Sequence, residues 1–405
     1  MLTEKDRIRL RDLAKRQLEL AESERNKQLY KDWEVHGRTD ASGRPMITVE
    51  FGTFCTEFVE PLLLCESDKA RELERMLLRD IFPFENFGDD TIIRNYIGVS
   101  EEYRIIPFGL AALREESGGL GHHIVPQVKD LAEDFHLLGK SGIELAEGHT
   151  LGEFVDEIVG DILPVKKTGR PRYAAFMQNI VHIMGMEDMY VAMLEEAELF
   201  HEMCAMLTND YIEAMERTES EGMLRATNGD VPLSQGSMCF SDDLPQSGDC
   251  LKTSQIWGYM DAQEAQGISP DMYHEFLFPY YKRISERFGL LSYGCCEGVD
   301  SFWDDISKFE NLRKLSISPW CNEEIIGGAL LGRKVVYHRK PSPNYIGVDR
   351  YLDEDAVRSH IKRTVDCASG LTLEFSQRDV YTVHCDIGKV ARFVKIIREE
   401  CEKKR

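Results

Sequence analysis

Four strand-like segments, each followed by a helix-like segment, fill the last third of the sequence. The strands are predicted at 290–293, 312–318, 334–339 and 371–375, and the helices at 299–309, 321–331, 353–365 and 387–400. Such alternation with short connections implies parallel strands joined by right-handed crossovers. An open doubly wound sheet and a closed barrel both fit. No glycine-rich phosphate turn opens these units, which disfavours the dinucleotide-binding kind of open sheet.

Weaker strand signals precede these units, near 162–166, 174–178, 223–227 and 255–259. Together the strands predict an α/β protein whose residues 156–405 form a (β/α)8 TIM barrel with the catalytic site. Residues 1–36 are predicted to form an N-terminal helical arm, with Thr3 as N-cap and Asp6 as a capping-box acid. Residues 37–155, with a strand at 46–51, are predicted to form an extension packed on the barrel.

The charge balance excludes some classes of partner. The 405 residues carry 49 Lys and Arg against 71 Asp and Glu, a formal net charge of −22. Nucleic acids and anionic membrane surfaces both select basic surfaces, so we expect neither as a partner. The sequence has no apolar stretch near ~18 residues and no signal peptide, which predicts a cytoplasmic protein. The charged helix predicted over 3–35 suits either a solvated arm or a homodimer contact.

Unusual polar groups follow the predicted strands. Cys295, Cys296 and Glu297 come after the strand at 290–293, and the last strand leads into His384 and Cys385. The C-terminal strand ends of a parallel barrel form one functional rim, and thiolate, imidazole and carboxylate groups are zinc ligands. A metal site is one interpretation. In the other, the cysteines pack in the barrel and Glu297 hydrogen-bonds a loop.

Two loop regions, 118–150 and 228–268, are predicted to shape the pocket, because long loops at the functional face of a barrel usually do so. Trp257 and Tyr293 could form walls for a flat apolar substrate. They could equally be aromatic residues of the core.

A series of short motifs runs through the second half of the chain. In order, they are GISPDMYHEF at 267–276, Pro279-Tyr280, Phe288-Gly289, Tyr293-Gly294-Cys295-Cys296-Glu297, Pro319-Trp320 and Arg339-Lys340-Pro341-Ser342-Pro343. This order resembles the uroporphyrinogen-decarboxylase-like superfamily, and within it the corrinoid-dependent (cobalamin-dependent) methyltransferases and O-demethylase components of anaerobic bacteria. The resemblance covers about residues 40–400 and implies a (β/α)8 barrel. The arginine-containing N-terminal run of the decarboxylases is absent.

The resemblance also implies a metal, because the methyltransferase members use zinc at the barrel rim. The implied ligands are Cys296, Glu297 and Cys385, with Cys295 and His384 less favoured. This sequence lacks the histidine of the family's first ligand pair, and Glu297 is the obvious replacement. As a ligand, Glu297 would belong to the catalytic machinery.

The implied reaction moves a methyl group from a small methylated substrate, such as a methoxylated aromatic, to a corrinoid on a separate protein. Zinc would polarise the ether oxygen, and His384 or Tyr293 would protonate it as it leaves. Trp257 would stack on the ring, and Asn228 or Gln263 would orient the oxygen. Methyl transfer from the corrinoid to a thiol, and metal-free decarboxylation, stay open as alternatives.

Overall fold

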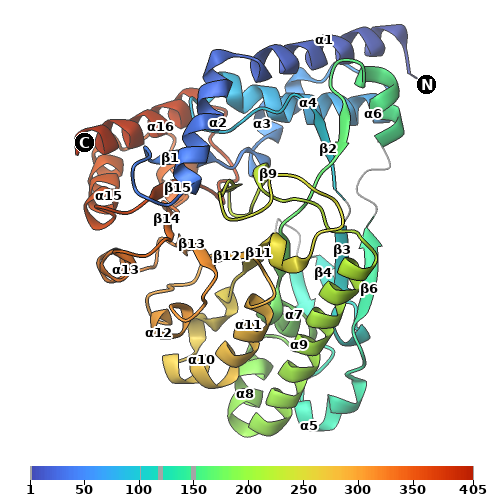
Figure 1. Ribbon diagram of the computed structural model, residues 1–405, viewed down its shortest axis with the longest axis vertical. Helices are drawn as coiled ribbons and strands as arrows, with labels where there is room; N and C mark the ends of the chain where they lie inside the picture. Colours follow the sequence, from blue (N-terminus) through green and yellow to red (C-terminus); the bar gives the residue numbers. More distant parts are fainter. Residues whose placement is uncertain (1, 101, 117–121, 147–151, 405) are drawn as a thin grey trace.

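A seven-stranded parallel sheet forms the centre of the molecule (Figure 1). The computed structural model describes residues 2–100, 102–116, 122–146 and 152–404. The strand order is β1 (Met46–Val49), β15 (Leu373–Gln377), β14 (Val336–Arg339), β13 (Leu312–Ile317), β12 (Leu290–Tyr293), β11 (Trp257–Met260) and β8 (Arg172–Ala174). Every pairing within it is parallel. The strand that comes first along the chain, β1, thus pairs with the strand that comes last, β15, as barrel topology requires.

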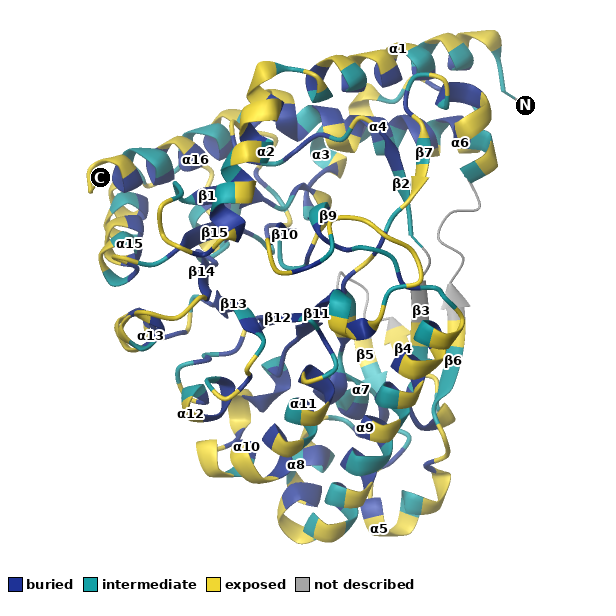
Figure 2. Ribbon diagram, viewed as in Figure 1, coloured by how far each residue is buried: buried dark blue, intermediate teal, exposed yellow. Residues whose placement is uncertain are grey.

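The four strand–helix units predicted from the last third of the sequence are present. Their helices are α12 (Trp303–Ile306), α13 (Glu323–Leu330), α14 (Asn344–Gly347), α15 (Glu354–Cys367) and α16 (Ile387–Glu402). The residues of β12 and β14 are buried throughout, which is typical of a parallel sheet covered on both faces. In Figure 2 these strands are dark blue, whereas α15 and α16 alternate between buried and exposed bands.

The earlier strands match the predictions less well. The segment predicted at 162–166 gives β7 (Val165–Lys167), which pairs with β2 (Ile97–Val99) outside the central sheet. The prediction at 174–178 overlaps β8 only at Ala174, because α7 (Phe176–Met184) begins two residues later. Residues 223–227 form no strand, only an isolated bridge between Arg225 and Asp249. The described residues therefore supply seven strands to this sheet, not eight.

A hairpin tip shows that the sheet is curled. Residues 234–237 connect β9 (Gly229–Pro232) to β10 (Met238–Cys239). The Gly236 carbonyl accepts from Thr48 of β1 at 2.7 Å, the Ser237 hydroxyl accepts from Lys314 of β13 at 2.6 Å, and Gln235 donates to Tyr259 of β11 at 2.7 Å. These three strands are not neighbours in the sheet. One short loop reaches all of them only because the sheet bends around it, as in a barrel.

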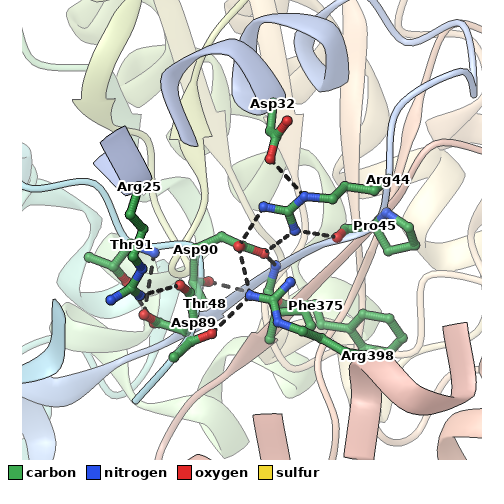
Figure 3. Close-up of polar contacts among 12 residues, drawn as sticks. Arg25, Asp32, Arg44, Pro45, Thr48, Asp89, Asp90, Thr91, Phe375 and Arg398 are labelled. Atoms are coloured by element: carbon green, nitrogen blue, oxygen red, sulfur yellow. Dashed lines mark hydrogen bonds and ion pairs between the residues drawn. The ribbon is translucent and has the colours of Figure 1, made fainter. Parts of the chain in front are cut away.

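The barrel is not closed, and the outer edge of β1 is bonded to Asp89 and Asp90, whose polar contacts are drawn in Figure 3. In the described ranges β1 and β8 form no ladder. Instead the Asp90 amide donates to the Ile47 carbonyl at 2.7 Å, and the Asp90 carboxylate accepts the Ile47 amide at 2.8 Å. The Asp89 carboxylate accepts the Val49 amide at 3.1 Å. The segment after α4 (Asp68–Asn86) thus occupies the edge that an eighth strand would use.

The predicted N-terminal arm is a pair of helices, α1 (Glu4–Ala21) and α2 (Glu24–Gly37). The predicted capping box at Thr3 and Asp6 is confirmed, since each side chain accepts the other's backbone amide. Helix α1 packs on α4 and α6 (Gly152–Val159). Strand β1 lies in the segment assigned to an extension, yet it belongs to the central sheet. Across the described ranges no helix has both the length and the apolar character to cross a membrane.

A second group of elements fills the lower part of Figure 1. The antiparallel pairs are β3 (Glu102–Ile106) with β6 (Gly142–Ala146) and β4 (Leu113–Glu116) with β5 (His122–Val125). The helices around them and below the sheet are α5 (Leu131–Asp134), α8 (Met186–Glu195), α9 (Ala197–Ser220), α10 (Pro270–Phe276) and α11 (Phe278–Ser285). The short α3 (Thr56–Val59) follows β1.

Candidate active site

A cavity of about 290 Å³ lies beside β8 and at the C-terminal ends of β11 and β12. Its wall includes Tyr173 from β8, Asp261 and Gln263 from the segment after β11, and Cys295 from the turn after β12. Functional groups of parallel barrels come from these same positions. We call this space the reaction cavity.

Asp261 is the acid of the reaction cavity. Its side chain is buried, and it accepts hydrogen bonds from the Tyr259 hydroxyl at 2.7 Å and the Tyr173 hydroxyl at 3.0 Å. Burial raises the pKa of Asp261, although the hydrogen bonds from the two phenols oppose the shift. Burial also raises the pKa of both phenols, and so does the charge of Asp261 when it is ionised, so the phenols remain protonated donors. The trio can hold a proton and deliver it at the cavity wall.

Gln235 joins the cavity to two cations. Its amide nitrogen donates to the Tyr259 hydroxyl, and its amide oxygen accepts from Lys340 and Arg378. Lys340 also donates to the Cys295 carbonyl at 3.1 Å, and Arg378 pairs with Glu50 at 3.2 Å. Burial lowers the pKa of Lys340. The two cations lie behind Gln235, where their positive charge favours negative charge in the cavity.

The vicinal thiols lie beside the cavity rather than in a metal cage. The Cys295 and Cys296 sulfurs are 3.6 Å apart; Cys295 lines the cavity and Cys296 is exposed. A hydrogen bond from Cys295, with help from the charge of Lys340, lowers the pKa of Cys296 to about 7.

Glu297 anchors two loops. Its side chain is fully buried, and its two carboxylate oxygens accept the Ala262 amide at 2.9 Å and the Cys295 amide at 2.8 Å. It thereby holds together the segments that carry Asp261 and Cys295. The sequence left two interpretations open, a metal site or a structural role. The structure agrees with the second, in which Glu297 forms hydrogen bonds to a loop. Its predicted roles as zinc ligand and catalytic group are not supported, because both oxygens are directed at backbone amides.

The other predicted ligands lie elsewhere. Cys385 is exposed, and its amide donates to Glu57 at 2.9 Å; His384 is exposed, with Nε2 3.2 Å from the Val348 carbonyl. The parts of the chain that the structure describes hold no group of three His, Cys, Asp or Glu side chains that could bind a metal ion. The predicted set of Cys296, Glu297 and Cys385 therefore does not fit zinc in this arrangement.

Three of the four predicted substrate-binding residues are structural. Tyr293 is buried with its hydroxyl 2.6 Å from that of Tyr273, and Trp257 is buried with its indole donating to the Cys239 carbonyl. Asn228 donates to the carbonyls of Ser241 and Leu244. Only Gln263 lines the reaction cavity. Of the predicted pocket loop 118–150, residues 118–121 and 147–150 lie outside the described residues.

Sequence reasoning missed the groups that make the cavity. Asp261 stands directly after a strand, in a segment already suspected of lining the pocket, so its position was a usable signal. Lys340 lies in a recognised motif, again at a strand end. Gln235 lies in the predicted pocket loop 228–268, but nothing in the sequence singled it out, because its place depends on a hairpin tip with a positive φ of 58°.

Glu264 gives the site a measurable pH dependence. It is buried, one carboxylate oxygen has no hydrogen-bond partner, and burial raises its pKa to about 7. A raised carboxyl pKa means stability that is present at low pH and is lost as the pH rises through about 7. We expect Glu264→Gln to match the wild type in urea unfolding at pH 4 and to exceed it by about 3 kcal/mol at pH 8. Equal stability at both pH values would contradict the shift.

Comparison with known proteins shows a general likeness of fold to solved structures and no match in sequence. No family model matches the chain, and no curated protein matches it. A solved structure of a methyltransferase from Methanosarcina mazei superposes with a TM-score of 0.49 and 11% identity, covering 89% of this chain and 94% of that chain. A likeness at this level carries no argument about the reaction. The superfamily assignment remains a resemblance that rests on the motifs.

Proposed function

We propose that this protein is a methyltransferase that moves a methyl group from a small O-methylated substrate to a corrinoid on a separate protein. The observation that carries the proposal is the buried Asp261 with its two phenols at the wall of the reaction cavity. A methyl ether is a poor electrophile until its oxygen is protonated or polarised. The motifs that resemble corrinoid-dependent methyltransferases support the same reaction.

The residues of this chain would act on the ether oxygen. When the methyl carbon–oxygen bond breaks, its electron pair stays on oxygen, which takes the proton of Asp261 directly or through the Tyr173 hydroxyl. Gln263 and Gln235 are placed to orient the substrate. The corrinoid, when bound, supplies the nucleophile that accepts the methyl group. No step passes through zinc, because the predicted ligands do not assemble. A homodimer remains a separate proposal.

Methyl transfer to free cob(I)alamin tests the proposal. Purified protein is mixed anaerobically with cob(I)alamin and a panel of methoxylated benzenes, and methylation is followed by loss of the Co(I) absorbance. We expect at least one ether to be demethylated, with one phenol formed per methylcobalamin. If no ether in the panel and no natural methoxylated extract supports methylation, with or without an added corrinoid protein, the proposal fails.

Metal-free decarboxylation is a second candidate, favoured by Lys340 and Arg378 behind the cavity. These cations could stabilise a substrate carboxylate or the electron pair left when carbon dioxide departs. Release of carbon dioxide from carboxylated members of the same panel, without cobalamin methylation, would select this reaction.

A further inference from the structure

The vicinal thiols, Cys295 and Cys296, take no part in the proposed reaction, yet they stand beside its cavity. Cys295 lines the reaction cavity, and Cys296 is exposed. Their sulfur atoms are 3.6 Å apart, so only a short approach separates them from the disulfide bond length of about 2.0 Å. An exposed thiol in contact with a second thiol is the arrangement that reversible oxidation requires.

Exposure and charge distinguish the two thiols. Cys296 meets the solvent, whereas Cys295 is buried. The hydrogen bond from Cys295, with help from the charge of Lys340, lowers the pKa of Cys296 to about 7. The same hydrogen bond and burial raise the pKa of Cys295. A thiolate is the attacking form of cysteine, so an oxidant reacts first with Cys296, and Cys295 is placed to attack the product.

The backbone of Cys295 links this pair to the rest of the site. Its amide donates to Glu297 at 2.8 Å, and its carbonyl accepts from Lys340 at 3.1 Å and from the Ser316 hydroxyl at 3.2 Å. That carbonyl belongs to the peptide group between the two cysteines. Adjacent Cα atoms are about 3.8 Å apart, closer than the roughly 4.4–6.8 Å usual for disulfides, so a bond between neighbours is strained and easily reduced. Its formation would act on the carbonyl that binds Lys340.

We propose that Cys295 and Cys296 are a modification site that forms a reversible disulfide, with a hydroperoxide as the oxidant and a low-molecular-weight thiol as the reductant. The Cys296 sulfur attacks the terminal oxygen of the hydroperoxide, the oxygen–oxygen bond breaks, and an alcohol leaves, or water in the case of hydrogen peroxide. The Cys295 sulfur then attacks the sulfenic acid on Cys296, and the departing hydroxide takes the Cys295 proton to give water. Two molecules of the thiol reverse the reaction and become a disulfide. The site does not depend on the proposed function.

Peptide mapping tests the inference without turnover. The reduced full chain is treated with hydrogen peroxide, its remaining thiols are alkylated, and it is digested with trypsin. Cleavage after Arg287 and Lys308 releases one peptide, 288–308, whose only cysteines are the vicinal pair. We expect most of this peptide to lose two hydrogens without gaining oxygen, and dithiothreitol to restore both thiols. A peptide that stays reduced, that keeps added oxygen, or that is linked to a different peptide would overturn the inference.

Serine variants separate the roles of the two thiols. In Cys295→Ser, peroxide should leave a sulfenic acid on Cys296, which dimedone traps. In Cys296→Ser, oxidation of peptide 288–308 is expected to slow at least 10-fold. The matched control Cys250→Ser removes another exposed cysteine and should form the disulfide as the wild type does. Oxidation of the peptide in Cys296→Ser as fast as in the control would overturn the inference. Reversible disulfide formation without any methyl transfer would sustain this inference and reject the proposed function.

Discussion

Asp261→Asn is expected to lower the rate of methyl transfer at least 100-fold while leaving the protein as stable as the wild type or slightly more stable. General acid catalysis is worth roughly 100- to 10,000-fold, and Asn cannot supply the proton. Stability should not fall, because burial disfavours the ionised form of Asp261, and Asn still accepts a phenol hydrogen bond. Single-turnover methylation of cob(I)alamin and thermal melting measure the two effects.

The control for this variant is a second buried aspartate outside the reaction cavity. Asp305 pairs with His274 at 2.8 Å and with Lys308 at 2.7 Å, away from the groups that line the reaction cavity. Asp305→Asn should keep the wild-type rate per folded molecule. If the rate of Asp261→Asn stays within about threefold of the wild-type rate, Asp261 is not the proton donor of the reaction.

The second large effect is expected at the edge of β1, where Asp90→Asn should destabilise the fold by about 3 kcal/mol or more. The Asp90 carboxylate is fully buried, and it binds Arg44 through two hydrogen bonds of 2.8 and 2.9 Å and Arg398 at 2.7 Å. Without its charge, the two guanidinium groups face each other with no carboxylate between them (Figure 3). Urea unfolding measures the loss.

Asp32→Asn is the matched control, because Asp32 pairs with the same Arg44 at 2.8 Å from a partly exposed position. Exposed ion pairs contribute roughly 0–1 kcal/mol, so the control should lose less than about 1 kcal/mol. Equal losses in the two variants would show that burial of Asp90 does not hold the edge.

The sequence predicted most of the fold where strand and helix periods were strong. The four units from 290 onward are present because their strand and helix segments alternate clearly at short spacing. Their strands are buried but are not continuous apolar runs, since β13 carries Lys314 and β15 carries Glu374.

Among the earlier strands, the predictions at 46–51 and 255–259 correspond to β1 and β11, whereas the prediction at 174–178 meets only the last residue of β8, which has three residues. The sequence could not show that an eighth strand is absent from the described sheet. The backbone amides at the edge of β1 donate to the side chains of Asp89 and Asp90, and no local sequence pattern encodes that contact.

The candidate site was predicted in place but not in detail. Of the four strand ends that the sequence singled out, the one after β12 supplies Cys295 to the cavity wall, and Gln263 comes from the predicted pocket loop 228–268; the ends of β13, β14 and β15 supply none of the described lining residues. The chemistry at each position depends on side-chain direction, which the sequence does not carry. Glu297 faces two amides, and Tyr293 faces Tyr273, although each looked like a rim residue. The position of Asp261 after a strand was visible in the sequence, but its burial and its two hydrogen bonds from phenols were not.

The most direct measurement is the methyl-transfer rate of the double variant Cys296→Ser/Cys385→Ser, taken with its zinc content. Because the proton comes from Asp261 in the proposed reaction, the double variant is expected to keep at least half of the wild-type rate. A fall of about 100-fold or more, together with the loss of one equivalent of zinc that the wild type retains, would contradict it.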